Sequence, residues 1–229
     1  MENEGIDYEH IIIDNNSTDN TQKVIKKLIQ ENNKIKAIFN LHNYGQSRSP
    51  FYAMLNTSGD ATIWIDSDLQ IPFESIPDLI NKWKEKKAQI ILLKRTSTYE
   101  GIFLKSARYL FYKFVNIFSS DQPSVNTNGN GIYDREVIKV LKNLKDPSPY
   151  LRGLVFELGF RIDYCNFQRE KRMYGKTSNN FFTLLDLGLT GIVKHTRAAR
   201  GLIIFGFLLS LIFLLIASHS CLRFEFFAN

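Results

Sequence analysis

The chain has 229 residues, of which 44% are apolar and 23% charged, and this composition excludes a disordered or fibrous protein. Its two cysteines are too few for a disulfide framework or a cysteine-rich metal site. The 29 Lys and Arg residues outnumber the 23 Asp and Glu residues, which gives a net charge of +6. Such a charge suits nucleic acid, phosphorylated substrates or an anionic membrane surface, and does not choose among them.

Apolar β-branched segments alternate with amphipathic ones along the first 93 residues. We expect strands at 10–13, 36–39, 61–65 and 89–93, and helices at 21–31, 47–56 and 76–86. This alternation predicts an α/β fold with a parallel sheet, in which ligands bind at the carboxyl ends of the strands. Asp14 and Asp66 both lie at such ends.

The segment from Gly201 to Ser218 is almost entirely apolar. No charged residue occurs between Arg200 and Arg223, and a helix over the intervening residues would be roughly 33 Å long, against a hydrocarbon core of about 30 Å. Its Leu, Ile and Phe residues offer roughly −4 to −8 kcal/mol of insertion free energy. A buried core helix is the alternative, but such helices rarely lack a polar stripe over this length. We therefore predict a transmembrane helix at 201–218.

The two flanks of this segment differ in charge. Arg223 stands alone after it, whereas the basic residues before it are Lys194, His195, Arg197 and Arg200. The positive-inside rule then predicts that residues 1–200 lie on the cytoplasmic side. Within 179–200, an apolar periodicity indicates either an amphipathic helix on the membrane or a helix packed on the domain.

The acidic segment W-I-D-S-D-L-Q-I-P follows the strand expected at 61–65. Asp66 and Asp68 are two positions apart, so both carboxylates can reach one hard cation, which completes its shell with water and substrate phosphates. A D-x-D pair alone is also typical of a solvated turn. The preceding strand, Gln70 and the second acidic strand end at Asp14 favour a site.

Several motifs in chain order carry a family resemblance. They are I-I-I-D-N-N-S-T-D-N-T, N-Y-G-Q-S-R-S-P, G-D-A-T-I-W-I-D-S-D-L-Q, N-T-N-G-N-G-I-Y-D-R-E-V-I, P-Y-L-R-G-L-V-F-E-L-G-F and R-M-Y-G-K-T-S-N-N-F-F-T-L-L-D. This series resembles the family-2 glycosyltransferases, and within them the polyprenyl-phosphate (dolichyl- or undecaprenyl-phosphate) glycosyltransferases. The resemblance covers roughly residues 8–200.

The resemblance implies a GT-A fold, with a nucleotide-sugar-binding, Rossmann-like and mostly parallel sheet flanked by helices, plus the C-terminal transmembrane helix. It divides the chain into a glycosyltransferase domain at 1–178, a juxtamembrane amphipathic and basic segment at 179–200, the transmembrane helix at 201–218 and a short tail at 219–229. The implied activity is metal-dependent, inverting transfer of a sugar from a UDP- or GDP-linked donor to polyprenyl phosphate on the cytoplasmic leaflet. The sugar and the oligomeric state stay open.

The resemblance also implies roles for the acidic residues and their neighbours. Asp66 and Asp68, with Gln70, would bind Mg²⁺ or Mn²⁺ and through it the donor diphosphate, whose developing charge the cation neutralises. Asp14, with Asn16, would bind the nucleotide base or ribose.

Basic residues would bind the phosphates. Arg108, with Lys94 or Arg95, is the expected clamp for the acceptor phosphate, whereas Arg172 and Lys176 would close over the donor diphosphate. An acceptor phosphate is already ionised near pH 7, so positioning matters more than a strong general base. For each of these residues alone, a solvated surface role is the alternative.

The chain departs from the family pattern at several positions. It lacks the opening strand with a P-x-Y-N-E-like segment, and Asn130 and Thr177 stand where an aromatic residue and Ser are usual. One apolar C-terminal segment stands where relatives usually have two. We expect both ends to be cut short, which would leave a sheet edge exposed and the nucleotide site incomplete.

Two functional hypotheses follow. The first is a membrane-anchored glycosyltransferase that moves a sugar from a nucleotide donor to polyprenyl phosphate. The second is a truncated, catalytically weak or inactive remnant that acts as a membrane-bound partner or as a fragment of a split gene. A nucleic-acid partner is not expected, because basic and aromatic residues are not clustered together outside the C-terminal part.

Overall fold

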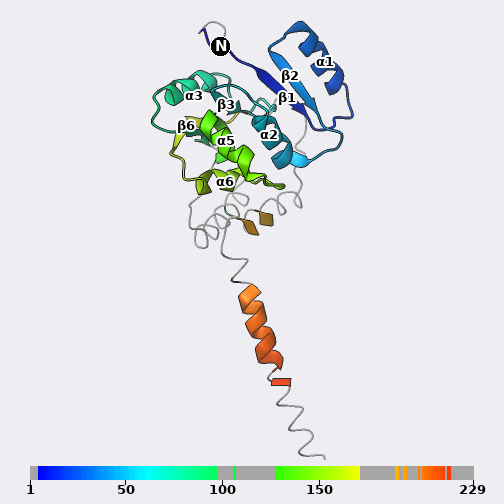
Figure 1. Ribbon diagram of the computed structural model, residues 1–229, viewed down its shortest axis with the longest axis vertical. Coiled ribbons are helices and arrows are strands. Elements are labelled where there is room, and N and C mark those ends of the chain that lie inside the picture. Colours follow the sequence, from blue (N-terminus) through cyan, green and yellow to red (C-terminus); the bar gives the residue numbers. More distant parts are fainter. Residues whose placement is uncertain are drawn as a thin grey trace, which may run out of the picture. The chain divides into compact units, whose positions relative to one another are not determined.

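The computed structural model describes residues 5–96, 106, 127–170, 189–190, 193–194, 201, 203–214 and 216–217 (Figure 1). The chain divides into two units, of which the first comprises Met1–Lys105 and Pro123–Ser178 and the second comprises Ser106–Gln122 and Asn179–Asn229. The helices and strands below belong to the first unit, except for the apolar helix described at the end.

In the first unit, strands and helices alternate from β1 to β4. The elements described after β4 are a strand, two helices and a final strand. Its elements are β1 (His10–Asp14), α1 (Thr21–Glu31), β2 (Ile35–Phe39), α2 (Gly45–Leu55), β3 (Ala61–Trp64), α3 (Ser75–Lys84), β4 (Ile90–Arg95), β5 (Thr127–Asp134), α5 (Arg135–Leu144), α6 (Leu151–Glu157) and β6 (Ile162–Phe167). The seven elements expected before residue 96 are all present, and the bounds of α1 agree with the prediction.

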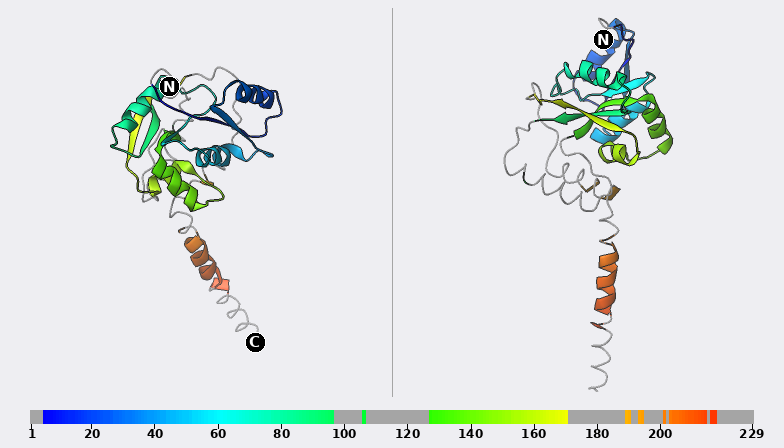
Figure 2. Two further views of the ribbon diagram at one scale, coloured as in Figure 1. Left: turned by 45° about the horizontal axis from the view of Figure 1, so that its top comes forward. Right: turned by 90° about the vertical axis from the view of Figure 1, so that its left-hand side faces the viewer.

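The strands of the described ranges form two sheets. β1 and β2 pair in parallel, and a second sheet has the order β3-β5-β4-β6. In the second sheet β5 is antiparallel to both β3 and β4, whereas β4 and β6 are parallel. In the described part of the chain, β1 pairs with β2 alone. In Figures 1 and 2, α1 lies beside the β1–β2 sheet at one end of the unit, and α3 lies beside β6 at the other.

The expectation of a mostly parallel sheet is therefore wrong, because the second sheet is mixed. The physical reason is β5, which enters between β3 and β4 and runs against both of them. Its sequence T-N-G-N-G-I-Y-D contains two Asn and two Gly residues, which are depleted in strands. A pattern search for apolar or alternating runs does not find such a strand.

The second sheet is covered on both faces, and β4 shows this most clearly. Ile90 and Leu92 belong to a core cluster shared with α2, α5 and α6, whereas Ile91 and Leu93 belong to a second cluster shared with α3. All four side chains are buried. A strand buried on both faces requires a continuous apolar run, which explains the sequence I-I-L-L at this position.

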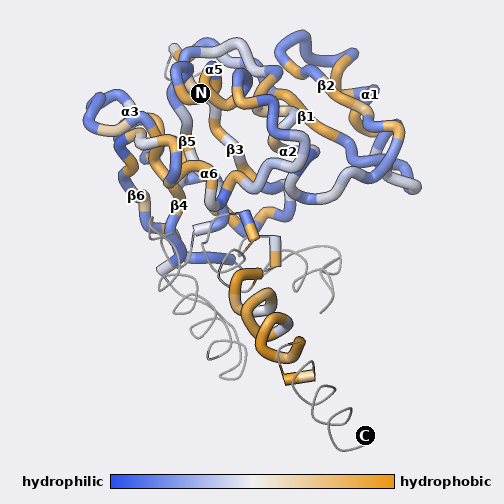
Figure 3. The backbone as a smooth tube through the Cα atoms, turned by 60° about the horizontal axis from the view of Figure 1, so that its bottom comes forward, coloured by the Kyte–Doolittle hydropathy of each residue, from blue (hydrophilic) through white to orange (hydrophobic). Residues whose placement is uncertain are grey.

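In the second unit, the structure describes an apolar helix over residues 203–214. Its large apolar side chains are between 40% and 72% exposed, and Figure 3 shows it as a continuous hydrophobic stretch. Within the described ranges, no helix is both long enough and apolar enough to cross a membrane. The transmembrane segment expected at 201–218 is described only in part, and it stays a prediction.

Candidate functional site

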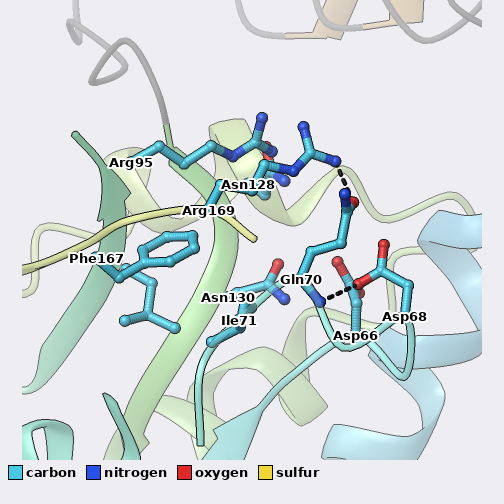
Figure 4. Close-up of a pocket in the computed structure, with 10 residues that line it drawn as sticks. Asp66, Asp68, Gln70, Ile71, Arg95, Asn128, Asn130, Phe167 and Arg169 are labelled. Atoms are coloured by element: carbon cyan, nitrogen blue, oxygen red, sulfur yellow. Dashed lines mark hydrogen bonds between the residues drawn. The ribbon is translucent and has the colours of Figure 1, made fainter. Parts of the chain in front are cut away.

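One pocket gathers polar side chains from four segments of the second sheet. The loop after β3 contributes acidic and amide groups, the end of β4 and the segment after β6 contribute guanidinium groups, and the start of β5 contributes two amides (Figure 4). Its lining residues are Asp66, Asp68, Gln70, Ile71, Leu93, Arg95, Asn128, Asn130, Phe167 and Arg169.

The strand directions bring these groups together. Because β5 is antiparallel to β3 and β4, its first residues lie beside the carboxyl ends of both neighbours, with Gly131 opposite Trp64 and Thr127 opposite Lys94. Successive side chains of a strand point to opposite faces, so Asn128 and Asn130 share one face. Opposite charges and neutral amides therefore meet at one end of the sheet.

The two carboxylates of the pocket influence each other. Burial by the pocket walls raises the pKa of Asp66, and the negative charge of Asp68 raises it further, whereas the Asn130 amide and the charges of Arg152 and Arg95 oppose this rise. The Asp68 carboxylate also accepts a hydrogen bond of 3.2 Å from the backbone N–H of Gln70. Two neighbouring carboxylates, one of which is buried and repelled by the charge of the other, are a suitable place for a cation.

The donor set fits a hard divalent cation. Asp66 and Asp68 would supply carboxylate oxygens, which Mg²⁺ and Mn²⁺ prefer. Among the described residues, no group of three or more His, Cys, Asp or Glu side chains comes together. A cation held by two carboxylates would keep positions for water and for substrate phosphates, and the metal role of this pair stays a prediction.

The loop between the acidic pair and α3 has a strained backbone. Leu69, between Asp68 and Gln70, has a φ of 56°, in the left-handed region that a bulky side chain rarely adopts. Such conformations persist where the surroundings impose them, and they cluster at ligand-binding sites. The surroundings here include the hydrogen bonds of Gln70.

Gln70 connects the acidic loop to the segment after β6. Its side-chain oxygen accepts a hydrogen bond from the Arg169 guanidinium, and its side-chain nitrogen donates one of 3.3 Å to the Glu170 carbonyl. A backbone hydrogen bond of 3.1 Å from Glu170 to Gln70 lies beside them. The oxygen that was expected to bind a metal ion therefore has a guanidinium partner.

Of the two adjacent basic residues on β4, one reaches the pocket. Arg95 lies in its wall, together with Arg169. The Lys94 ammonium instead lies 5.3 Å from the ring centre of Tyr164. Tyr164 packs against the core cluster shared with α2, α5 and α6. Strand alternation separates the two side chains, so Arg95, rather than Lys94, suits the role of phosphate ligand.

Asp14 and Asn16 lie in the other sheet, at the end of β1. The Asp14 side chain is 3% exposed and accepts hydrogen bonds from the Ser17 backbone at 3.2 Å and from the Gln22 amide at 2.8 Å. Burial alone would raise the pKa of Asp14, but these hydrogen bonds outweigh it and lower the pKa. Asn16 has a φ of 65°, which Asn tolerates well.

A polar network that the sequence did not reveal joins the same strand end to α2. The side-chain oxygen of Asn15 accepts hydrogen bonds from the Asn40 amide at 3.1 Å, the Ser49 hydroxyl at 2.7 Å and the Tyr44 backbone at 2.9 Å. The network positions the loops after β1 and β2 relative to each other. These hydrogen bonds hold the backbone beside Asp14 and Asn16, where the base or ribose is expected to bind.

Three predicted site residues, Arg108, Arg172 and Lys176, lie outside the described residues. Six pocket residues were not predicted as site residues, namely the apolar Ile71, Leu93 and Phe167 and the polar Asn128, Asn130 and Arg169. The N-G-N-G pattern at 128–131 was the available signal for the amides, since alternate positions of a strand share a face. Arg169 gave no signal of its own, because β6 had not been identified.

Comparison with known proteins shows the family to which the chain belongs. The sequence model of glycosyl transferase family 2 matches residues 1–142. An uncharacterized glycosyltransferase of Synechocystis sp. is 29% identical over 191 residues, which are 83% of this chain and 60% of the relative. The bactoprenol glucosyl transferase of Shigella phage SfX is 30% identical over 189 residues, which are 82% of this chain and 62% of the relative.

These curated relatives are longer than this chain, which spans about three fifths of their length. A solved structure of TarS from S. aureus, residues 1–349 in complex with UDP-GlcNAc, is similar with a TM-score of 0.45 and 18% identity. That similarity covers 82% of this chain and 58% of the solved TarS chain of residues 1–349.

Proposed function

We propose that this chain, which belongs to glycosyl transferase family 2, transfers a sugar from a nucleotide-diphosphate donor to a polyprenyl phosphate at a membrane surface. The observation that carries the proposal is the pocket itself. Two carboxylates, Asp66 and Asp68, face two guanidinium groups, Arg95 and Arg169, at one end of a sheet (Figure 4). Acidic groups for a cation and basic groups for phosphate are the two requirements of a diphosphate site.

The acidic pair would hold Mg²⁺ or Mn²⁺. When bound there, the cation would neutralise the charge that develops on the departing diphosphate. The protein's own contribution is to fix the donor. Arg169 is already tied to Gln70, so its guanidinium is oriented before a phosphate arrives, and a guanidinium grips phosphate oxygens in a bidentate manner. A fixed cationic group of this kind limits the motion of the leaving group.

A polyprenyl phosphate acceptor agrees with the names of the curated relatives, several of which are bactoprenol glucosyl transferases. The acceptor oxygen is ionised near pH 7, so its attack on the sugar needs positioning more than proton removal. Arg95 in the pocket wall is suited to this, and Arg108 is the expected second cation. The relatives' names also support glucose as the transferred sugar and thus UDP-glucose as the first donor to test.

Membrane anchoring is part of the proposal. The exposed apolar helix over residues 203–214 and the preceding basic residues support an anchor with the catalytic unit on the cytoplasmic side. Removal of residues 201–229 should then release the chain from the membrane fraction of cells that express it. Recovery of the complete chain in the soluble fraction would contradict the anchor and leave the pocket chemistry untouched.

The test of the activity combines binding and transfer. We expect the detergent-solubilised chain with Mn²⁺ to bind UDP-glucose or GDP-mannose in calorimetry, and Asp68→Ala to weaken that binding at least about tenfold, since it removes one cation ligand. Asp78→Ala, an exposed acidic residue at the start of α3, is the matched control and should bind as wild type.

Transfer is measured as radiolabelled sugar that becomes extractable with undecaprenyl phosphate. Donor binding together with extraction of the label would establish the glycosyltransferase. A folded chain that binds neither donor would instead support the alternative of a non-catalytic remnant.

A further inference from the structure

Asn130 is the pocket residue whose polar atoms are least satisfied. Its side chain is 2% exposed, and neither its amide nitrogen nor its amide oxygen makes a hydrogen bond of normal geometry to a described residue, although the amide lies near enough to the Asp66 carboxylate to lower the pKa of that group. Figure 4 shows the amide turned toward Asp66 and Gln70 inside the pocket. Buried polar groups in folded proteins are almost always paired, so an exception at a pocket wall indicates a group that pairs with a ligand.

The neighbouring amides are used differently. The Gln70 side chain is bonded to Arg169 and to the Glu170 carbonyl, so both of its polar atoms are engaged. Asn128 also faces the pocket, but it lies two residues nearer the start of β5 and is only partly buried. Asn130 is therefore a buried residue that faces the pocket, and its amide atoms are available to hydrogen-bond a ligand.

The chemistry of an amide limits the possible ligand. Asn130 offers N–H donors and one carbonyl acceptor, and both kinds of atom lack partners. A phosphate oxygen would satisfy only the donors, and a cation would satisfy only the carbonyl. A hydroxyl group both donates and accepts, so it can satisfy either atom, and adjacent hydroxyls can satisfy both. Sugars present such hydroxyls beside a diphosphate.

The backbone holds this amide in place. Asn130 directly precedes Gly131, which pairs with both β3 and β4, and it lies in the irregular stretch of the β4–β5 register between Gly131 and Thr127. Its neighbour Gly131 fits so closely against β4 that a Cβ atom there would lie 2.2 Å from the Ile91 carbonyl oxygen. A side chain on a strand confined in this way cannot withdraw from the pocket to find water, and it is preorganised for a ligand.

We propose that Asn130 binds a hydroxyl group of the donor sugar and thereby helps to determine which sugar is transferred. The proposal rests on the proposed function, since it presupposes a nucleotide sugar in this pocket. It assigns Asn130 to the sugar, whereas Asp66 and Asp68 serve the cation and the diphosphate. A site that hydrogen-bonds a substrate hydroxyl discriminates strongly against ligands that lack it, because its own polar groups are then left unpaired.

The test compares a nucleotide sugar with its nucleoside diphosphate. Asn130→Leu keeps a similar volume and removes the hydrogen-bonding atoms. With Mn²⁺ present, we expect this variant to bind UDP-glucose at least about tenfold more weakly than wild type, while its affinity for UDP changes less than about threefold. If wild type prefers GDP-mannose, the same comparison uses GDP. Asn166→Leu, on the exposed position of β6, is the control and should bind both ligands as wild type.

The outcomes separate the two proposals. Equal weakening of UDP-glucose and UDP in Asn130→Leu would overturn the sugar contact, because it would place the residue at the cation or diphosphate. Unchanged binding of both ligands would overturn it as well. A folded wild-type chain that binds no nucleotide sugar would overturn the proposed function, and the inference with it.

A second variant guards against a folding defect. Asn130→Ala removes the same polar atoms without adding apolar volume, and circular dichroism shows whether each variant unfolds cooperatively. Because an unpaired buried amide is removed, we expect the ligand-free variant to unfold at a temperature no lower than that of wild type. A marked decrease in both variants would show that the amide is paired within the folded chain, and would contradict the inference.

Discussion

The carboxylate of Glu9 accepts two hydrogen bonds from Ser58, at 2.5 Å from its backbone N–H and 2.7 Å from its hydroxyl. Glu9 immediately precedes β1, and Ser58 lies between α2 and β3, so this contact joins the two sheets of the first unit. The other carboxylate oxygen of Glu9 contacts the Lys36 ammonium on β2 at 2.6 Å. One side chain thus connects β1, β2 and the approach to β3.

Glu9 should make folding stability depend on pH in the acidic range. Burial by itself raises the pKa of Glu9, but the hydrogen bonds from Lys36 and Ser58 and the lysine charge lower it from 4.5 to about 2. Since the folded value is the lower one, the stabilisation is complete above about pH 4.5 and is lost as the pH falls through 2. The Lys36 side chain is 59% exposed, so solvent screens part of the effect, and about 1–2 kcal/mol remains.

The measurement is urea unfolding of the wild-type chain and of Glu9→Gln between pH 7 and pH 2.5. We expect Glu9→Gln to be less stable by about 1–2 kcal/mol at pH 7 and the gap to close toward the lower pH. A gap that stays constant over this range would show that the charge of Glu9 does not contribute. Glu74→Gln, an exposed residue next to α3, is the control.

Gly131→Ala should destabilise the fold severely. Its Cβ atom would lie 2.2 Å from the Ile91 carbonyl oxygen and 3.0 Å from the Leu92 Cα atom, both of them backbone atoms that cannot rotate away. We expect a loss of at least about 2 kcal/mol in unfolding free energy, because β4 and β5 must move apart. Thermal or urea unfolding measures this. Gly59→Ala, where the nearest contact would be 3.3 Å, should cost much less, and equal costs at both sites would refute the argument.

Arg169→Met should weaken nucleoside diphosphate binding by about tenfold, because it removes one of the guanidinium groups of the pocket and releases the Gln70 side chain. Arg169→Lys keeps the charge but cannot bind in a bidentate manner, so it should restore only part of the affinity. Isothermal calorimetry with UDP and Mn²⁺ tests both variants. Arg161→Met, at an exposed position before β6, is the control. Wild-type affinity in Arg169→Met would exclude the residue from the phosphate site.

Cys165 should be unreactive in the folded chain. Its side chain is buried in the core cluster near α3, and burial raises the pKa of the thiol, with Asp78 and Asp163 raising it further against the opposing charge of Lys82. In a Cys221→Ser variant, which leaves one cysteine, we expect a thiol reagent at pH 8 to label the protein only after urea is added. Rapid labelling of the native chain would show that β6 opens readily.

The sequence predicted the elements that follow ordinary patterns. α1 was found with correct bounds because a polar turn precedes a clear amphipathic period, and β4 because I-I-L-L is a run that only a doubly buried strand requires. The acidic pair at Asp66 and Asp68 was placed correctly at the end of β3. These features depend on local spacing, which a sequence displays directly.

The features that were missed depend on pairing between distant segments. β5 lies next to β3 across more than sixty residues of sequence, and its Asn and Gly residues do not resemble a strand. Arg169 becomes part of the pocket only through Gln70, 99 residues earlier in the chain. The different environments of Lys94 and Arg95 follow from which face of β4 each occupies, and this could not be assigned before the partners of β4 were known.

The alternation along β5 also limits how this strand can vary in length. Asn128 and Asn130 face the pocket, whereas Gly129 lies against the Trp64 ring and Gly131 against the backbone of β4. Insertion or deletion of a single residue would exchange the two sets, turning the amides into the packed interior and the glycines toward the ligand. Substitutions can therefore adjust the polar wall one side chain at a time, but a change of length would remove it in a single step.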